Sequence, residues 1–440
     1  MSTSASPYDG GPYEGGMLAQ QGQGLVGRPT TIAAIVMLLI FSHAWVYPLV
    51  GGEAADAADP GSVVRALYFP AYLIGGAIFL QSARDVFPAI ARQPFLIAIA
   101  LVVALSVTWS ISPEQTARRA FAFYFTTLAG VVIGVRFRWA QLAEVLAATF
   151  AILAVLSLLT VVLFPSVGIM STIFPGAWCG LWSEKNTFGG NMTMGAVIML
   201  AASILNPQRR LVWCGFAALA IFLVLMSTSK TALICLLPGL GALAFVSVAG
   251  RGPTWGVVSG WLLVLVATAV AATLLLNPDL LFSLVGKDAT FTGRTKIWTA
   301  AMRQVAERPW TGYGYGVFWA QKGGWGPLAW IIAEAGFKPQ HAHNTWLEQL
   351  IAMGVLGLTA FSLFFIQTII SCAVAVFRNP GAYLALPFFV AYSLTTLTES
   401  VGAVYNDLTW VIFCAFAVAL AGRKARGDDF EPEEAEAEAY

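Results

Sequence analysis

Two of the three histidines in this 440-residue chain stand together in the sequence His341-Ala342-His343-Asn344. A neutral imidazole accepts a proton near neutral pH, so this residue type suits a general base acting on a hydroxyl group. Two other roles stay open for the pair, metal binding and the structural capping of the following helix. No cluster of acidic residues nearby in the sequence completes a metal site, so we expect no metal here.

Basic residues at or near the starts of predicted helices form a second group that could do chemistry. They are Arg65, Arg118, Arg119, Lys185, Lys230 and Arg294. A helix N-terminus carries partial positive charge, so a cation there is locally unfavourable. A bound anion removes this conflict, because it interacts with both the helix N–H groups and the side-chain cation. We therefore interpret the group as the site of a shared anionic ligand. The alternative for each residue is a side chain that extends into water or lipid headgroups.

The sequence around each lysine refines this interpretation. Lys230 follows Ser227-Thr228-Ser229, whose hydroxyl groups can cap the helix and donate to phosphate oxygens. Lys185 follows Glu184, with which it can instead pair locally.

The segment Gly312-Tyr313-Gly314-Tyr315-Gly316, followed by Phe318 and Trp319, mixes glycine with aromatic residues. Such a mixture suits a tight turn or a surface on which a sugar stacks, and we favour the turn. It is no dinucleotide-binding fingerprint, because no strand-turn-helix context surrounds it. Tyr313, Tyr315, Trp319 and Asn344 are the candidates for binding the sugar of an acceptor.

Membrane helices must position these residues. The chain is 58% hydrophobic and 11% charged, whereas soluble domains carry about 25% charged residues. We expect an all-α, polytopic bundle of about twelve transmembrane helices. The expected spans are 30–50, 63–80, 95–111, 120–135, 141–164, 189–205, 211–226, 231–249, 255–276, 347–373, 382–398 and 404–421. The net charge of +1 gives no argument for nucleic acid, and the five cysteines predict no disulfide framework.

Arginines in alternate connectors orient the bundle. Cytoplasmic connectors are enriched in Lys and Arg, and the enriched set here holds Arg84, Arg92, Arg136, Arg138, Arg209, Arg210, Arg251 and Arg378. Both termini are then cytoplasmic. The connector at 51–62, with Glu53, Asp56 and Asp59, and a long loop at 277–346 lie outside.

This orientation divides the chain into five parts. A disordered segment, 1–29, precedes the first nine spans within 30–276, and the outer catalytic loop is 277–346. The last three spans occupy 347–421, and an acidic tail is 422–440. Within the loop, Ile297, Trp298, Ala301, Met302 and Val305 recur with helical period after Arg294, and Pro309 ends that helix.

Several motifs occur in an order typical of one known family. They are Gly293-Arg294-Thr295-Lys296-Ile297-Trp298, Gly312-Tyr313-Gly314 and His341-Ala342-His343-Asn344-Thr345-Trp346-Leu347-Glu348 with Gly354 and Gly357, preceded by Trp109–Pro113 with Arg118 and by Lys185-Asn186. Over most of 95–420 the chain resembles the O-antigen ligase and polymerase superfamily, especially its ExoQ-like exopolysaccharide polymerases. Many relatives carry arginine where this chain has Lys230, which leaves a point charge in place of a bidentate donor.

The resemblance implies a fold of the GT-C type and an inverting glycosyltransferase whose donor is a glycan on undecaprenyl pyrophosphate. Lys230 and Arg294 would bind the pyrophosphate, with Arg118, Arg119 and Lys185 as secondary candidates. His343, or else His341, would deprotonate the acceptor hydroxyl. No Asp-x-Asp motif occurs, in agreement with a reaction that needs neither metal nor other cofactor.

Four functions remain open. The favoured one is a polymerase of lipid-linked repeat units in the bacterial inner membrane, with a flippase and chain-length or export proteins as further partners. The second is a ligase that transfers glycan to lipid A-core or protein. The third is a polysaccharide transporter or flippase, disfavoured because the spans hold few acids, with Glu144 the clearest. The fourth, a metal-dependent glycosyltransferase using Glu53, Asp56 and Asp59, competes with simple solvation of that acidic loop.

Overall fold

The computed structural model describes residues 29–51, 61–276, 294–321 and 326–422, and these are almost entirely helical. No strand occurs among them apart from an isolated antiparallel bridge between Ile169 and Trp178. The expected disordered N-terminus, the acidic tail, the acidic loop with Glu53, Asp56 and Asp59, and the start of the long loop lie outside the described residues.

Twelve helices overlap the twelve expected spans. They are α1 (Pro29–Phe41), α5 (Phe69–Ala91), α6 (Pro94–Leu105), α7 (Pro113–Arg136), α8 (Trp139–Leu163), α10 (Lys185–Leu205), α11 (Arg210–Met226), α12 (Lys230–Ala249), α13 (Pro253–Leu276), α17 (Thr345–Ala375), α18 (Ala382–Thr396) and α19 (Leu408–Gly422). The other helices are α2 (Val46–Val50), α4 (Gly61–Ala66), α9 (Pro165–Gly168), α15 (Arg294–Glu307) and α16 (Pro327–Ala335), with 3₁₀ turns at Ser106–Thr108 and Pro207–Arg209.

Length and composition separate these helices into two groups. Among the described residues, seven helical segments are long and apolar enough to cross a membrane, and five shorter apolar helices accompany them. The protein is therefore an all-helical, multi-pass membrane protein. The number of twelve crossings stays an expectation, because a short helix needs tilt or neighbouring residues to span the bilayer.

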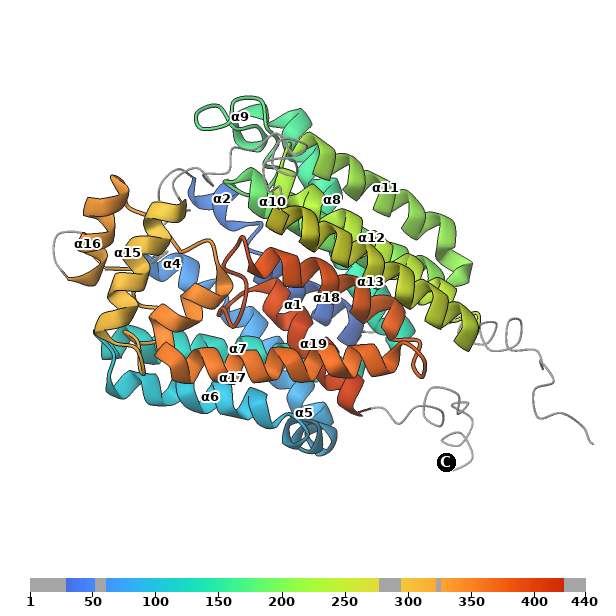
Figure 1. Ribbon diagram of the computed structural model, residues 1–440, viewed down its shortest axis with the longest axis horizontal. Coiled ribbons are helices and arrows are strands. Elements are labelled where there is room, and N and C mark those ends of the chain that lie inside the picture. The colour runs from blue at the N-terminus through green and yellow to red at the C-terminus, as the bar shows by residue number, and fades with distance from the viewer. Residues whose placement is uncertain (1–28, 52–60, 277–293, 322–325, 423–440) are drawn as a thin grey trace, which may run out of the picture.

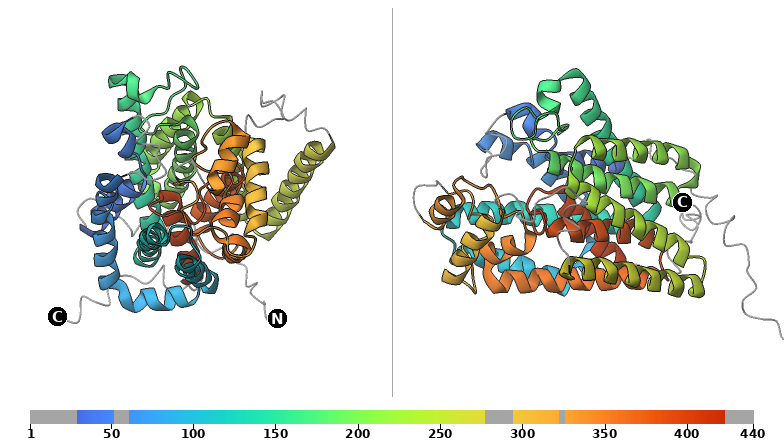
Figure 2. Two further views of the ribbon diagram at one scale, coloured as in Figure 1. Left: turned by 90° about the vertical axis from the view of Figure 1, so that its left-hand side faces the viewer. Right: turned by 45° about the horizontal axis from the view of Figure 1, so that its top comes forward.

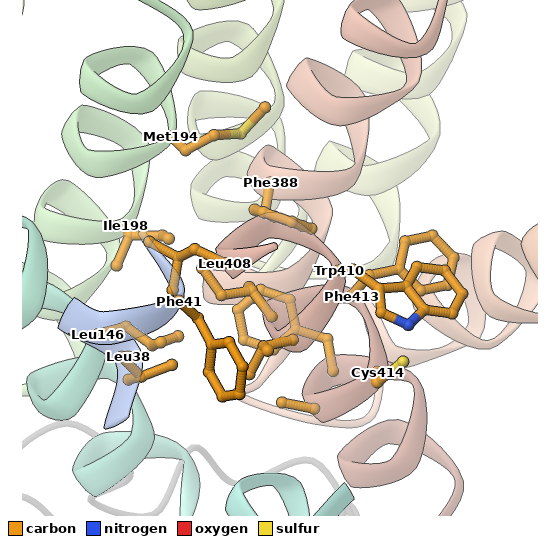
Figure 3. Close-up of a cluster of buried hydrophobic side chains, with 14 of the residues drawn as sticks. Leu38, Phe41, Leu146, Met194, Ile198, Phe388, Leu408, Trp410, Phe413 and Cys414 are labelled. Atoms are coloured by element: carbon orange, nitrogen blue, oxygen red, sulfur yellow. The ribbon is translucent and has the colours of Figure 1, made fainter. Parts of the chain in front are cut away.

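Close helix packing builds the centre of the bundle. Gly130 and Gly134 of α7 are spaced as in the small-residue motif of membrane helix pairs. A Cβ atom added at Gly134 would lie 2.4 Å from the Ala415 carbonyl oxygen of α19, so only glycine permits this approach. Aromatic side chains such as Trp410, Phe413 and Phe388 fill the adjoining core (Figure 3).

The described part of the long loop forms a layer at one end of the bundle, where α15 and α16 lie side by side (Figures 1 and 2). The predicted helix is confirmed as α15, which ends at Glu307, two residues before Pro309. Its buried face holds Ile297, Ala300, Ala301 and Val305. Met302 is 50% exposed, so its assignment to this face was wrong. The helix packs on α16 and α17 through this apolar face.

The Gly-Tyr-Gly-Tyr-Gly segment completes a break in α17. Gly354 has φ +64° within α17, which interrupts the helical hydrogen bonds there. Tyr313 N and Gly314 N donate to the carbonyl oxygens of Ile351 and Ala352, at 3.0 and 2.9 Å, and Val355 N donates to Pro309 O at 2.8 Å. Buried backbone groups freed at such a break need hydrogen-bond partners. The segment is therefore a turn whose N–H groups bind the carbonyl groups left free at the helix break. A turn is the structure that the sequence favoured.

Candidate active site

Lysine and arginine side chains mark the starts of three helices that lead into one region. Lys185 and Lys230 are the first residues of α10 and α12, and Arg294 is the first described residue of α15. The prediction that cations occupy helix starts is confirmed for Lys185 and Lys230. Arg65 lies instead in the last turn of α4.

Polar contacts join the starts of α10 and α12. Ser229 caps α12 by accepting a hydrogen bond from Ala232 N, and its hydroxyl donates to Asn186 Oδ1 at 2.8 Å. Asn186 Nδ2 in turn donates to Glu184 Oε1 at 2.8 Å. Thr228 has φ +51°, a conformation that non-glycine residues adopt at a cost, which is typical of functional sites. Lys185 Nζ lies 3.5 Å from Thr228 Oγ1, and its charge is close enough to that of Lys230 for the two to repel.

Glu399, in the connector between α18 and α19, joins Arg294 to His343. The Arg294 guanidinium lies 3.0 Å from Glu399 Oε1 and also donates to Thr398 O at 2.6 Å. His343 Nδ1 lies 3.0 Å from Glu399 Oε2. Burial would raise the pKa of the Glu399 carboxyl, but its hydrogen bond to His343 and the charges of His343 and Arg294 hold that pKa below its usual value.

This geometry can orient His343 as a base. A carboxylate only accepts hydrogen bonds, so Nδ1 carries a proton, and Nε2 presents its lone pair whenever the ring is neutral. The side chain is 23% exposed, so a substrate can reach it. His343 also has φ +52°, a second strained backbone position in the same region. Such strain persists only where the surrounding structure fixes the residue.

His341 lies against His343 and is a poorer base. The ring centroids are 3.9 Å apart, and His341 Nδ1 accepts a hydrogen bond from the His343 backbone N–H at 3.2 Å. Burial, with the charges of His343 and Arg294, lowers the pKa of His341 to about 3 despite the opposing charge of Glu399. The ring is therefore neutral at physiological pH, with its proton on Nε2.

Glu184 brings a second carboxyl group toward the Arg294–Glu399–His343 group. Burial raises the pKa of Glu184, and the negative charge of Glu399 raises it further, while His343, Asn186 and Arg294 act in the opposite direction. These electrostatic interactions connect the starts of α10 and α12 with the His343 region. The starts of α10 and α12 therefore lie near the histidine loop.

Glu348 holds the histidine loop in place. Its carboxylate accepts hydrogen bonds from Ala342 N at 2.5 Å, Trp319 Nε1 at 2.8 Å and Ser400 Oγ at 3.1 Å. Asn344 caps α17 by accepting from Leu347 N at 3.0 Å. The structure thus gives Trp319 and Asn344 positioning contacts, beside the sugar-binding role predicted for them.

The other predicted residues differ in their contacts and in their exposure. Arg118 forms an exposed pair with Glu114 at 3.5 Å, away from the histidines in its contacts. Arg119 is buried, donates to Gly316 O and lies over the Tyr405 ring. Tyr313 and Tyr315 are 3% and 4% exposed. Their hydroxyl groups donate to Gln304 O and Ala403 O, so neither ring forms an open stacking surface.

A metal ion has a more complete set of ligand atoms than the sequence indicated. His341, His343 and Glu399 place one ligand atom each within 4.8 Å of one another. The argument that no acid accompanies the histidines is therefore wrong. Arg294 already pairs with Glu399 and opposes a second cation at that carboxylate. The geometry admits a metal, and the charge around it disfavours one.

Sequence reasoning gave Glu348 and Glu399 no role at the site, and it gave Glu184 only a local pairing with Lys185. Glu399 was detectable in principle, because it is an acid in a connector predicted to lie on the same face as the long loop. Nothing local in the sequence shows that this connector meets the histidines, since 56 residues separate Glu399 from His343.

Comparison with known proteins finds relatives of this chain. Residues 215–362, which include Lys230, Arg294 and both histidines, match the family model described as O-antigen ligase. The chain is thus similar, over this segment, to the O-antigen ligase family. It is 26% identical over 328 residues to the exopolysaccharide production protein ExoQ of Rhizobium meliloti, which covers 70% of this chain and 71% of ExoQ. It is 25% identical over 185 residues to an O-antigen ligase of Pseudomonas aeruginosa, which covers 42% of this chain and 36% of that ligase.

The similarity to these two proteins agrees with the resemblance that the motifs indicated. The family match begins within α11 and ends within α17. Glu184 and Glu399 lie outside it, so the complete O-antigen ligase-like site needs helices on both sides of the matched segment.

Proposed function

We propose that this protein polymerises undecaprenyl-pyrophosphate-linked repeat units into exopolysaccharide or O-antigen. The observation that carries the proposal is a histidine–glutamate pair next to cationic helix starts. Helix N–H groups together with lysine and arginine are suited to a pyrophosphate, and an oriented imidazole is suited to a hydroxyl group. The similarity to ExoQ over 70% of the chain favours polymerisation.

The proposed reaction is a single displacement at the anomeric carbon of the donor. His343 Nε2 takes the proton of the acceptor hydroxyl while its oxygen attacks that carbon from the side opposite the pyrophosphate. The new glycosidic bond forms as the carbon–phosphate oxygen bond breaks, and undecaprenyl pyrophosphate leaves with its electron pair. Lys230, Arg294 and Lys185 stabilise the charge that develops on the leaving group. The anomeric configuration inverts.

Purified protein tests this function directly. Lipid-pyrophosphate repeat units, extracted from a strain whose own polymerase is deleted, serve as donor and acceptor. We expect products of two or more repeats together with free undecaprenyl pyrophosphate, and the same rate with EDTA present. No elongation by wild-type protein would overturn the proposal, and loss of activity in EDTA with recovery on adding a divalent cation would place a metal at His341, His343 and Glu399.

A ligase is the second candidate, because the matched family model and one relative carry that name. It uses the same donor and base but a different acceptor, such as lipid A-core. Single-repeat transfer to that acceptor, without elongation, would select it. A transporter is less well supported: Glu144, the clearest acid in the spans, pairs with Arg209 at 3.7 Å.

We also propose that the site faces the periplasm, in a bacterial inner membrane with both termini cytoplasmic. The arginine-rich connectors carry this orientation. In a variant lacking its native cysteines, Lys338→Cys should react with an impermeant thiol reagent in cells with a permeabilised outer membrane, and Gln208→Cys should not. Both positions are exposed in the structure. The reverse pattern would invert the topology and remove access to periplasmic donor.

A further inference from the structure

A carboxyl group that has no cation partner lies beside the cationic helix starts. Glu184 immediately precedes Lys185, the first residue of α10, and its side chain is only partly exposed. Its Oε1 accepts a hydrogen bond from Asn186 Nδ2 at 2.8 Å, and it forms no ion pair with any described residue. The local pairing with Lys185 that the sequence allowed is therefore absent. An ionised carboxyl group that is partly removed from water without such a pair is unfavourable.

A second carboxyl group, that of Glu399, reaches the same end of the bundle. Helix α18, which leads to it, packs against both α10 and α12. In the last turn of α18, Thr395 Oγ1 lies 3.5 Å from Cys235 Sγ of α12, and Glu399 N donates to Thr395 O at 2.8 Å. Glu399 therefore lies about one turn beyond Thr395, close to the level of Lys230 at the start of α12.

The two carboxyl groups differ in their partners. Glu399 has two, since the Arg294 guanidinium and His343 Nδ1 each lie 3.0 Å from one of its oxygens. Glu184 has only the neutral amide of Asn186. The negative charge of Glu399 and burial both favour the neutral form of Glu184. Where two carboxyl groups share a site, the group with weaker compensation is the one that takes up a proton.

A bound pyrophosphate would sharpen this difference. The side chains of Asn186 and Ser229, joined at 2.8 Å, connect Glu184 to the start of α12. Lys185 and Lys230 therefore begin their helices on either side of this link. An anion held there is attracted by both lysines and repelled by an ionised Glu184. A protonated carboxyl group removes the repulsion and supplies a hydrogen-bond donor.

We propose that Glu184 takes up a proton from water when the pyrophosphate of the donor binds, and that its protonated carboxyl group donates a hydrogen bond to a pyrophosphate oxygen. One proton adds to the carboxylate, and no other bond changes. Asn186 continues to donate to Oε1, so the proton is carried on Oε2. The inference rests on the proposed function, because it adds a residue to the proposed pyrophosphate site and makes donor binding depend on pH.

Proton uptake fixes the direction of that dependence. A bound anion raises the pKa of Glu184, so the donor binds most tightly where the carboxyl group is already protonated in the free protein. Above the pKa of the free carboxyl group, affinity falls about tenfold for each pH unit, until the pKa of the complex is reached. His343, Glu399, Arg294 and the two lysines are the other charged or titratable groups around the bound anion.

Glu184→Gln tests the proposal because it imitates the protonated carboxyl group. The new amide oxygen can accept from Asn186, and the new amide nitrogen can donate to phosphate. Glu184→Ala removes both groups. Glu114→Gln is the matched control, since it makes the same change at an exposed glutamate that pairs with Arg118 at 3.5 Å.

The probe is farnesyl methyl pyrophosphate, a diester whose phosphate groups do not titrate near neutral pH. Calorimetry on full-length protein in nanodiscs, repeated over a pH series in two buffers of different ionisation enthalpy, counts the protons taken up for each bound probe. At the pH of greatest uptake, wild type and Glu114→Gln should take up about one proton more than Glu184→Gln. Glu184→Ala should bind about tenfold more weakly than Glu184→Gln, because it lacks the donor.

Equal proton uptake by wild type and Glu184→Gln would assign the proton to another group and overturn the inference. A wild-type Kd that does not rise with pH overturns it without any variant. Either result beside normal elongation of repeat units leaves the proposed function standing. Proton uptake that depends on Glu184, without any elongation by wild-type protein, would instead overturn the proposed function and leave the assignment of the proton standing.

Discussion

Replacing His343 with alanine is expected to lower the rate of glycan transfer by about 10²–10⁴-fold at saturating donor, the usual contribution of a positioned general base. The reason is geometric. Glu399 fixes the proton on Nδ1 at 3.0 Å, so Nε2 is held as the acceptor for a hydroxyl proton. The loss should fall on kcat, because the imidazole acts on the acceptor and not on the pyrophosphate. Steady-state transfer with purified lipid-linked donor measures it.

Two further variants separate base chemistry from loop structure. Glu399→Gln keeps the size of the side chain but removes the charge that orients His343 and pairs with Arg294, so we expect a large loss of kcat there as well. His341→Ala should cost less, because a ring whose pKa is lowered to about 3 is a weak base. Near-normal turnover by His343→Ala with failure of His341→Ala would move the base two residues upstream. If both alanine variants stayed active, the mechanism would consist of leaving-group activation alone.

Helix positions could be read from the sequence because membrane insertion imposes long apolar runs. Every expected span has a helical counterpart, and α15 follows from the spacing of Ile297, Ala301 and Val305. The error at Met302 has a simple cause: the apolar face points to α16 and α17, and periodicity alone does not fix how wide the buried face is.

Only part of the candidate site could be predicted from the sequence. Charge at helix starts identified Lys185, Lys230 and Arg294, because this pattern is local. It also included Arg118, whose neighbour Glu114, four residues earlier, already satisfies it. Glu399 and Glu184 come to the histidines from other connectors, and such long-range contacts leave no local pattern. The sugar-binding role of Tyr313 and Tyr315 stays a prediction, and their glycine neighbours serve a helix break at Gly354.

The pyrophosphate should depend on Lys230 and Arg294 in different ways. Lys230→Ala removes a charge at the start of α12, and we expect transfer to fall by about 10²–10³-fold, as when one group that stabilises developing negative charge is lost. Lys230→Arg should retain activity, because it keeps the charge and adds donors. Arg294→Lys should fail although it keeps the charge. Arg294 binds Thr398 O and Glu399 Oε1 with two nitrogens at once, a fork that lysine lacks.

The matched control is Arg118→Ala, because Arg118 is an arginine of the same sequence-predicted group whose partner is the exposed Glu114. Glycan transfer by this variant should stay within about twofold of wild type, because an exposed ion pair contributes little free energy. Binding of lipid-pyrophosphate donor to each variant in nanodiscs, measured together with protein yield, separates lost donor binding from lost folding.

Normal transfer by both Lys230→Ala and Arg294→Ala would move the pyrophosphate away from these helix starts. Arg119 would be its next candidate, and the charge of Glu399 would then serve His343 alone.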